Sequence, residues 1–387
     1  MRSLSFIGNN ALQLLHSGGD FFPALTAAFD AAVSEIFLET YIFALDDTGT
    51  VIRDALHRAA ERGVVVYVMT DWLGTGRVGS NSLAAGFAQA GVHFRSFNPW
   101  FSRGVARTHR KLCVVDRRIA FVGGLNINDD MRDDSHPQIV LPAPRWDFAV
   151  QIDGPLAAVI HLELDTQWVR LGKLGLRARW QRFKSVRATF ATVSQAPALA
   201  ALVMRDNLRN RRTIQRAYLQ ALGQARTSVL VANPYFAPGR KLRKALELAA
   251  ARGVEVTLLL GVGQFHMQDA VAHSYYPKLL KHGVKIVEYE KTQLHAKVAV
   301  VDDDWATVGS SNYDGLSLFV NQEANLVIRD ATFARALRAR IEEGIAQGVP
   351  VIEAEFANKP WYKRLWYGAA FMLYVGVLRA ITLGKYA

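Results

Sequence analysis

The sequence predicts an α/β fold made of two similar halves, each a sandwich of helices on a mixed β-sheet. Two observations support this fold class. A pattern of polar and glycine positions occurs twice with one constant offset, and a similar succession of apolar strands and amphipathic helices precedes each copy. The 387 residues suffice for two domains or for one large pseudo-symmetric domain with a sizeable core. The fold class therefore follows from repetition as well as from local pattern.

Each half opens with an apolar, β-branched segment that predicts a strand. We expect first strands at 36–43 and 229–236 and second strands at 64–69 and 254–260. An amphipathic helix fills each interval between these strands, and a further helix follows the second strand. Glycine comes after the expected helices, at Gly63, Gly91, Gly253 and Gly283. Glycine is the residue expected there, because the chain leaves a helix C-terminus in a left-handed conformation. This alternation is typical of α/β folds.

The repeated pattern has the form His-x-Lys-x4-Asp with a glycine and an asparagine downstream. The first copy comprises His109, Lys111, Asp116, Gly123 and Asn126, and the second comprises His295, Lys297, Asp302, Gly309 and Asn312. All five pairs of positions are 186 residues apart. One copy alone would be a weak signal, whereas two copies in one register are very unlikely to arise by chance. The chain therefore contains a duplicated site.

The spacing within each copy suits phosphate chemistry. Residues i and i+2 of a strand share a face, so the histidine and the lysine of each copy should point together. Apolar strands follow at 112–115 and 298–301, and a polar turn and a second strand bring the asparagine back toward them. Each half thus supplies an imidazole, a cation and an amide, which can stabilise a highly negative phosphoryl transition state. Two halves supply two imidazoles, one to attack phosphorus and one to protonate the leaving oxygen.

The duplicated motif resembles the signature of the phospholipase D superfamily, which the lipid enzymes of that superfamily carry twice per chain. Four further segments are similar to bacterial cardiolipin synthases: Glu39–Phe43, Asn233–Phe236, Trp305–Asn312 and Asn321–Asn325. The similarity extends from the first strand to about residue 345. It implies that the halves pack around a pseudo-twofold axis with the active site at their interface. The commonest bacterial type begins with two transmembrane helices. This chain has no run of eighteen apolar residues and no signal peptide, so it is similar to the shorter type.

The resemblance also implies roles for individual residues. His109 is expected to form the phosphohistidine, and His295 to protonate the departing oxygen and then to deprotonate the incoming alcohol; the reverse assignment stays open. The donors expected to hold the phosphate oxygens are Lys111, Lys297, Asn126 and Asn312. The carboxylates that the resemblance supplies to orient the imidazoles are Glu323 and, after a longer insertion, Asp147.

Other residues near the motifs are expected to have structural roles, or have either a structural or a substrate-binding role. Asp116 and Asp302 stand at strand ends, where side-chain bonds to the backbone can fix a hairpin turn, so we expect structural roles for them. The motif glycines Gly123 and Gly309 are likewise expected to be structural. Four residues are either substrate-binding or simply structural: Ser310, Ser311, Glu39 and Tyr41. We expect no cofactor and no metal, because no Cys/His cluster has zinc-ligand spacing. The single cysteine, Cys113, excludes a disulfide framework and is expected to be buried.

Charge and composition indicate an anionic partner. The net charge is +12, and the stretch 170–216 holds twelve lysine or arginine residues but one acid, Asp206. We interpret this stretch as a headgroup-binding patch; a solvated basic face between the halves is the alternative. The expected organisation is a first half at 1–165, a basic connection at 166–215, a second half at 216–350 and a tail at 351–387.

The tail combines aromatic residues with flanking cations. Its apolar run, Leu365–Leu378, is shorter than the roughly twenty residues of a bilayer span. The aromatic residues are Trp361, Tyr362, Trp366, Tyr367, Phe371 and Tyr374, and the flanking cations are Lys363, Arg364, Arg379 and Lys385. This composition favours an interfacial or re-entrant membrane helix. A helix that docks on the sheet as part of the core is the alternative.

Together these features predict a cardiolipin synthase. It would transfer a phosphatidyl group from phosphatidylglycerol, or from another phospholipid, to a phosphatidylglycerol hydroxyl and release glycerol. We expect a peripheral or monotopic protein of cytoplasmic origin on the anionic surface of the bacterial inner membrane, with no nucleic-acid partner. The alternatives are a hydrolase that makes phosphatidic acid, a nuclease of the same superfamily and an inactive lipid-binding module. The sequence does not predict an oligomeric state.

Overall fold

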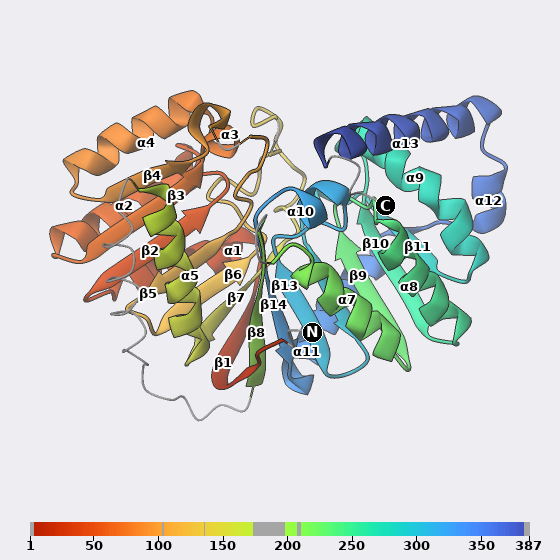
Figure 1. The fold of residues 1–387 in the computed structure, drawn as a ribbon, viewed down its shortest axis with the longest axis horizontal. Coiled ribbons are helices and arrows are strands. Elements are labelled where there is room, and N and C mark those ends of the chain that lie inside the picture. Colours follow the sequence, from red (N-terminus) through yellow and green to blue (C-terminus); the bar gives the residue numbers. More distant parts are fainter. Residues whose placement is uncertain (1–3, 103, 135, 173–197, 207–209, 383–387) are drawn as a thin grey trace.

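The structure, a computed structural model, describes residues 4–102, 104–134, 136–172, 198–206 and 210–382 (Figure 1). The first half contains β1 (Ile7–His16), α1 (Ser17–Asp30), β2 (Glu35–Thr40), α2 (Asp47–Glu61), β3 (Val65–Asp71), α3 (Trp72–Thr75), α4 (Arg77–Gln89), β4 (His93–Phe97), η1 (Pro99–Phe101), β5 (Leu112–Val115), β6 (Ile119–Gly123), β7 (Phe148–Asp153) and α5 (Leu156–Leu171). The second half contains β8 (Ala198–Arg205), α7 (Thr213–Gln224), β9 (Ser228–Asn233), α8 (Arg240–Ala251), β10 (Glu255–Gly261), α9 (His266–Lys281), β11 (Lys285–Tyr289), β12 (Val298–Val301), β13 (Trp305–Gly309), α10 (Gly315–Phe319), β14 (Glu323–Arg329) and α11 (Ala331–Ala346). A C-terminal segment adds β15 (Val349–Pro350), α12 (Glu353–Ala357) and α13 (Trp361–Ile381).

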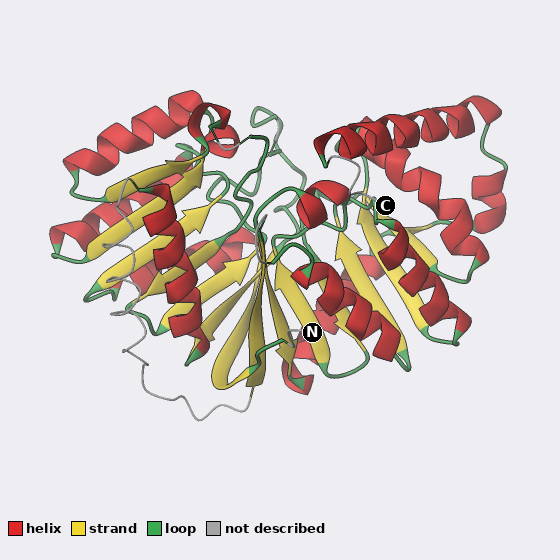
Figure 2. Ribbon diagram, in the orientation of Figure 1, coloured by secondary structure: helices red, strands yellow, loops and turns green. Residues whose placement is uncertain are grey.

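The strands form one sheet whose order repeats outward from a central seam. On one side of the seam the order is β1-β7-β6-β5-β2-β3-β4, and on the other it is β8-β14-β13-β12-β9-β10-β11-β15. Strands β1 and β8 join the halves as a short antiparallel pair. Within each half both parallel and antiparallel pairs occur, and helices flank the sheet (Figure 2). The predicted fold class, two pseudo-symmetric α/β halves with mixed sheets, is confirmed.

The helix ends predicted from glycine are present in both halves. Gly63 and Gly253 each have φ of +90°, the left-handed region that glycine adopts without a steric penalty. The N–H of Val64 donates to the carbonyl of Ala59, five residues earlier. The N–H of Gly63 donates to the carbonyl of Ala60, three residues earlier. This is a Schellman arrangement, and α8 ends in the same way at Gly253. These caps turn the chain directly into β3 and β10.

The first strand of each half is shorter than predicted. Strands β2 and β9 end at Thr40 and Asn233, so Phe43 and Phe236 lie outside the regular ladders. Each phenylalanine instead forms a single bridge, Phe43 to Ile127 and Phe236 to Tyr313. The apolar pattern continues past the strand because these side chains are buried beneath loops rather than within the sheet.

The basic connection expected at 166–215 is only partly a connection. Helix α5 crosses the expected boundary at residue 165, and β8 lies within the expected connection. Strand β8 pairs with β14 from Leu199 to Arg205, and its apolar residues complete the sheet of the second half. Much of the basic stretch, residues 173–197 and 207–209, lies outside the described residues.

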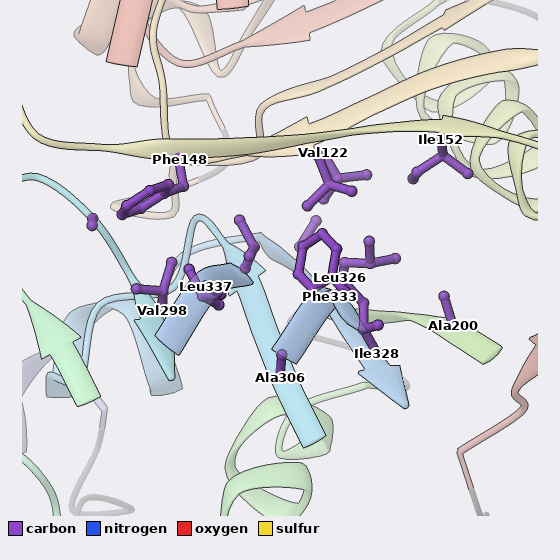
Figure 3. Close-up of a cluster of buried hydrophobic side chains, with 14 of the residues drawn as sticks. Val122, Phe148, Ile152, Ala200, Val298, Ala306, Leu326, Ile328, Phe333 and Leu337 are labelled. Carbon is purple, nitrogen blue, oxygen red and sulfur yellow. The ribbon is translucent and has the colours of Figure 1, made fainter. Parts of the chain in front are cut away.

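One hydrophobic core is shared by the two halves (Figure 3). Side chains from β6 and β7 face those from β12, β13, β14 and α11, which belong to the second half. The labelled members are Val122, Phe148, Ile152, Ala200, Val298, Ala306, Leu326, Ile328, Phe333 and Leu337. Separate clusters on the outer faces of the sheet bury the helices of each half. The shared core holds the two hairpins that carry the motifs against one another.

The aromatic part of the tail forms one helix, α13, that lies along α9 (Figure 1). Ala370 and Leu378 are buried, Phe371 and Tyr374 pack against the core of the second half, and the Tyr374 hydroxyl accepts a hydrogen bond from the N–H of Gly315. The helix therefore docks on α9 and not on the sheet, and it is continuous rather than re-entrant. Within the described residues, no helix is both long and apolar enough to cross a bilayer. Its opposite face is exposed. The exposed residues are Trp361, Tyr362, Leu365, Trp366, Met372, Leu373, Val377 and Ile381.

Candidate active site

The two motifs lie immediately before the hairpins β5–β6 and β12–β13. We expected the histidine and the lysine to open these strands, but the ladders begin one residue after each lysine, at Leu112 and Val298. The reason is that the motif backbone bonds to the opposite half instead of to its own sheet. The N–H of His109 donates to the carbonyl of Gln322 at 2.9 Å, and the N–H of His295 donates to that of Trp146 at 2.9 Å.

These backbone bonds deliver each orienting carboxylate to the histidine of the other half. Glu323 follows Gln322, and its Oε2 lies 3.1 Å from Nδ1 of His109. Asp147 follows Trp146, and its Oδ2 lies 2.6 Å from Nδ1 of His295. Both carboxylates expected from the resemblance are thus brought to imidazoles. The pairing is crossed, so neither half holds a complete histidine–carboxylate pair of its own.

The contacts of His109 fix its tautomer. Its Nδ1 also lies 3.1 Å from the carbonyl of Ser310, and a carbonyl can only accept, so Nδ1 carries the hydrogen. The lone pair of the neutral ring is then on Nε2, the nitrogen that is free to attack. The Ser310 hydroxyl donates to Glu323 at 2.5 Å, which places Ser310 behind the carboxylate and not among the phosphate donors. The hydroxyl of Ser311 faces the carbonyl of Asn312 at 3.4 Å.

The motif lysines are buried and close to one another. Nζ of Lys111 donates to the carbonyl of His109 at 3.0 Å, and Nζ of Lys297 donates to that of His295. Burial and the charge of Lys297 lower the pKa of Lys111 to about 7. Burial lowers the pKa of Lys297 to about 8, although the carboxylate of Asp147, 3.7 Å away, opposes this. A bound anion would stabilise the charged form of both lysines.

The neutral form of both imidazoles is favoured near pH 7. Burial and Lys111 lower the pKa of His109, and burial and Lys297 lower that of His295 well below its ordinary value. Although burial opposes ionisation of Glu323, the hydrogen bonds that it accepts from His109 and Ser310 keep the pKa of that carboxyl below its usual range, whereas burial raises the pKa of Asp147. A bound phosphodiester would add a negative charge and thereby favour protonation of one imidazole.

The motif asparagines and glycines occupy the ends of the hairpins. Oδ1 of Asn126 accepts from the N–H of Ile42 at 3.4 Å, which uses the acceptor end of the amide and not its donor end. Oδ1 of Asn312 is buried without a partner among the described residues. A Cβ at Gly123 would lie 2.6 Å from the Cα of Ala149, and one at Gly309 would lie 2.5 Å from that of Asn325. Only glycine permits these close strand approaches.

The motif aspartates lie at the far ends of the hairpins and do not contact the imidazoles. Asp116 accepts from the N–H groups of Val33, Ser34 and Glu35 at 2.8–2.9 Å. Asp302 accepts in the same way from 226–228, just before β9. We expected these carboxylates to fix the hairpin's own turn. They instead attach the hairpin to the start of the neighbouring strand, because their left-handed backbone, with φ of 52° and 50°, points them there.

Glu39 and Tyr41 have different positions relative to the site. Glu39 is fully buried and accepts from Thr108 Oγ1 at 2.6 Å and from Arg110 Nη2 at 2.8 Å. It therefore supports the two residues that flank His109. The ring of Tyr41 lies 4.9 Å from that of His109, and Nζ of Lys111 lies 5.4 Å from the Tyr41 ring centroid. Tyr41 thus lines the site beside the imidazole.

Sequence reasoning missed one acid beside His295, the half-buried Asp134. Its Oδ2 lies 3.6 Å from Nε2 of His295, while its Oδ1 contacts Arg145 Nη2 at 3.1 Å and Asn128 Nδ2 at 2.7 Å. Asp134 belongs to the longer insertion between Asn126 and Asp147, which the second half lacks. A search for repeated positions cannot find a residue that occurs in one half only. The available signal was the cluster of aspartates in that insertion.

Comparison with known proteins agrees with this architecture. The family description "Cardiolipin synthase, PLD-like domain" matches residues 25–136 and 218–344. Cardiolipin synthase B of Salmonella typhimurium strain LT2 is 38% identical over 92% of this chain and 85% of its own length, and that of Escherichia coli K12 is 37% identical over 91% and 85%. Cardiolipin synthase 1 of Bacillus cereus is 30% identical over 91% of this chain and 70% of its own.

A solved structure supports the same fold. The phosphatidylserine synthase of Haemophilus influenzae Rd KW20 superposes with a TM-score of 0.70 over 99% of this chain and 97% of its own, at 14% identity. An identity of 14% supports the similarity in fold and nothing further. The family match and the identity to the cardiolipin synthases extend over most of the sequence, including both motifs. The chain therefore belongs to the cardiolipin synthase family, phosphatidyltransferases of the phospholipase D superfamily.

Proposed function

We propose that this enzyme makes cardiolipin from two molecules of phosphatidylglycerol. The observation that carries the proposal is the crossed pair of buried imidazoles, each oriented by a carboxylate and both beside a buried lysine pair. Such a site can hold a phosphodiester anion between a nucleophile and a general acid. The acceptor is a lipid alcohol and the intermediate is covalent, so no cofactor is required by this chemistry.

His109 is the nucleophile in this proposal. Its Nε2 attacks phosphorus while the bond to the departing glycerol oxygen breaks and His295 gives that oxygen a proton. A hydroxyl of the second phosphatidylglycerol then loses its proton to His295 and displaces His109 from phosphorus. Lys111, Lys297, Asn126 and Asn312 stabilise the charge on the non-bridging oxygens. Water in place of the alcohol would give phosphatidic acid, so the acceptor site decides between transfer and hydrolysis.

The products of phosphatidylglycerol in mixed micelles test this function. The wild type should form cardiolipin and free glycerol, and His109→Ala should form neither. A phosphatidyl donor whose leaving group is p-nitrophenolate needs no proton, so it should restore leaving-group release to His295→Ala but not to His109→Ala. Phosphatidic acid as the sole product would make the enzyme a hydrolase. Rescue of His109→Ala instead would reverse the two roles.

The exposed face of α13 supports action on a membrane surface. Soluble proteins rarely expose so many large apolar side chains along one helix. A cavity of about 550 Å³ lies between α9, α12 and α13, and the cations Arg243, Lys278 and Arg364 stand among its aromatic walls. Apolar and aromatic side chains beside cations are the composition of helices that lie in the interface of an anionic bilayer. We infer that α13 rests on such a surface with phosphatidylglycerol as a neighbour.

A further inference from the structure

We propose that Asp134 and His295 together form a subsite for the vicinal hydroxyls of a glycerol headgroup. The subsite would hold the glycerol that leaves and then the glycerol end of the acceptor lipid. This inference rests on the proposed function and names the feature that selects its alcohol.

Among the described residues, the hydrogen-bond partners of the Asp134 carboxylate contact only one of its two oxygens. Oδ1 is occupied by Arg145 and Asn128, at 3.1 and 2.7 Å. Oδ2 faces Nε2 of His295 at 3.6 Å, which is longer than a hydrogen bond. Nδ1 of His295 is held by Asp147, so Nε2 is the nitrogen that exchanges a proton with substrate. Neighbouring hydroxyls of a vicinal diol can contact this nitrogen and Oδ2 at the same time.

The charge of Asp134 argues for an alcohol and against phosphate as its ligand. Although burial opposes ionisation, the charge of Arg145 and the hydrogen bond from Asn128 keep the pKa of Asp134 below its ordinary value. A charged carboxylate repels a phosphodiester anion but accepts hydrogen bonds from hydroxyl groups. The phosphate is therefore directed toward the lysines, and the headgroup alcohol toward Asp134.

Asp134 also makes the two halves of the site unequal. Asp147 comes 21 positions after Asn126, whereas Glu323 comes 11 positions after Asn312. The insertion that carries Asp134 is fixed by Arg145, a buried side chain that also donates to Gln293 Oε1 at 2.8 Å and to the carbonyl of Arg132 at 2.6 Å. Within the described residues, the carboxylate that contacts His109 is that of Glu323, and it contacts Nδ1. The alcohol subsite thus adjoins His295 alone. His295 is therefore placed to exchange a proton with the alcohol, and His109 is placed to attack phosphorus.

In the proposed reaction Asp134 selects the alcohol but takes no part in bond making or proton transfer. The acceptor hydroxyl transfers its proton to Nε2 of His295, its oxygen forms the new bond to phosphorus, and the bond between phosphorus and His109 breaks. Asp134 exchanges no proton and accepts a hydrogen bond from the second hydroxyl. Water and a monohydric alcohol have no second hydroxyl, so they lack this contact.

Competition between 1,2-propanediol and 1-propanol tests the subsite. Both alcohols would compete for the same phosphatidyl-enzyme, so the ratio of the two phosphatidyl alcohols does not depend on how much of a variant is folded. The wild type should favour the diol, and Asp134→Asn should reduce that preference by about tenfold, because a hydrogen bond to a neutral acceptor is weaker. Asp133→Asn is the matched control. Asp133 lies on the same loop but contacts Gln293 Nε2 at 3.2 Å, so this variant should keep the wild-type ratio.

The outcomes separate the inference from the proposed function. A ratio that is unchanged in Asp134→Asn, or a wild type without preference for the diol, would overturn the subsite while transfer itself stood. An equal loss of preference in Asp133→Asn would also overturn it, because the effect would then come from the loop. A wild type that forms neither phosphatidyl alcohol nor cardiolipin would remove the proposed function and the subsite with it.

Discussion

At the scale of single residues, burial converts two ordinary lysines into an anion receptor whose strength depends on pH. Lys111 and Lys297 have pKa values lowered to about 7 and about 8. Each lysine is charged at pH values below its own pKa and loses its charge as the pH rises through that pKa. An anion that binds to the charged form must in turn raise both pKa values by linkage. Affinity for a phosphate-like anion should therefore fall as the pH increases from 6.5 to 9.

Sulfate is the suitable probe, since it does not titrate in this range. Its dissociation constant, measured by isothermal titration calorimetry, should increase at least about tenfold between pH 6.5 and 9. Lys111→Arg is the control, because arginine keeps its charge throughout. That variant should lose affinity less steeply over the same range. Equal pH profiles for the wild type and for Lys111→Arg would contradict the assignment of a titrating cation.

The residues of the site divide into those that the repeat predicts and those that it cannot predict. Histidine, lysine and asparagine recur in one register, so their membership follows from sequence. The crossed pairing of His109 with Glu323 depends on which backbone strands meet across the interface, and no local pattern encodes that meeting. Asp134 stands outside the repeat altogether. Symmetry in the sequence therefore identifies the chemical groups, whereas the asymmetric insertion has to be seen in three dimensions.

At the scale of elements, Gly124 shows how closely the strands of the site approach. A Cβ at this position would lie 2.2 Å from Oδ1 of Asp147. The matching position in the second half is Ser310, whose hydroxyl donates to Glu323. Gly124→Ala should displace Asp147 from His295 and lower kcat at least about a hundredfold, because the imidazole loses its orienting partner.

Gly86→Ala in α4 controls for the change from glycine to alanine. A Cβ there would meet nothing within 4 Å, so this variant should keep full activity and gain up to about 1 kcal/mol in free energy of unfolding. Thermal melts and steady-state kinetics of both variants are sufficient. Full activity of Gly124→Ala would show that Asp147 tolerates displacement, and its assigned role would then be wrong.

Helix α13 carries the second prediction at this scale. Removing the helix would also strip Phe371 and Tyr374 from the second half, so substitutions on its exposed face are the sharper test. Replacing Leu365, Met372 and Leu373 by serine should lower binding to phosphatidylglycerol vesicles at least about tenfold in a cosedimentation assay. A matched control replaces the exposed Val33, Val78 and Val140 by serine and should bind as the wild type does.

The same face has one competing occupant, a second copy of the chain. Light scattering in the absence of lipid distinguishes the two. A monomer that binds vesicles through these side chains supports the membrane assignment. A dimer that the α13 substitutions dissociate, with vesicle binding unchanged, would contradict it.

Local elements were predictable where the signal was local. The Schellman caps at Gly63 and Gly253 depend on one backbone conformation, and glycine reports it directly. The ends of β2 and β9 were not predictable. Phe43 and Phe236 lie beyond the regular ladders and form single bridges with residues that are distant in the sequence. The docking of α13 on α9 was missed for the same reason: both faces of that helix are apolar, so its pattern does not tell which face packs.

At the scale of the whole molecule, the sequence is compatible with two domains or with one pseudo-symmetric domain, and the structure joins the halves. They share the core of Figure 3 and pair through β1 and β8. Each half also needs the other to complete its histidine–carboxylate pair. The contacts between the halves therefore assemble the active site, and the same contacts should make the molecule unfold as a unit.

Equilibrium unfolding in urea tests this coupling. Leu56→Ala removes a side chain buried in the first half's own cluster, and Leu242→Ala removes one buried in that of the second half. Each should lower the free energy of unfolding by about 2–5 kcal/mol. If the halves are coupled, both variants move one common transition, seen at the same urea concentration by tryptophan fluorescence and by far-ultraviolet circular dichroism. If the halves unfold independently, two transitions appear and Leu56→Ala moves only one of them. That result would mean that the shared core orients the halves without coupling their stability, and that the crossed carboxylates can separate while each half stays folded.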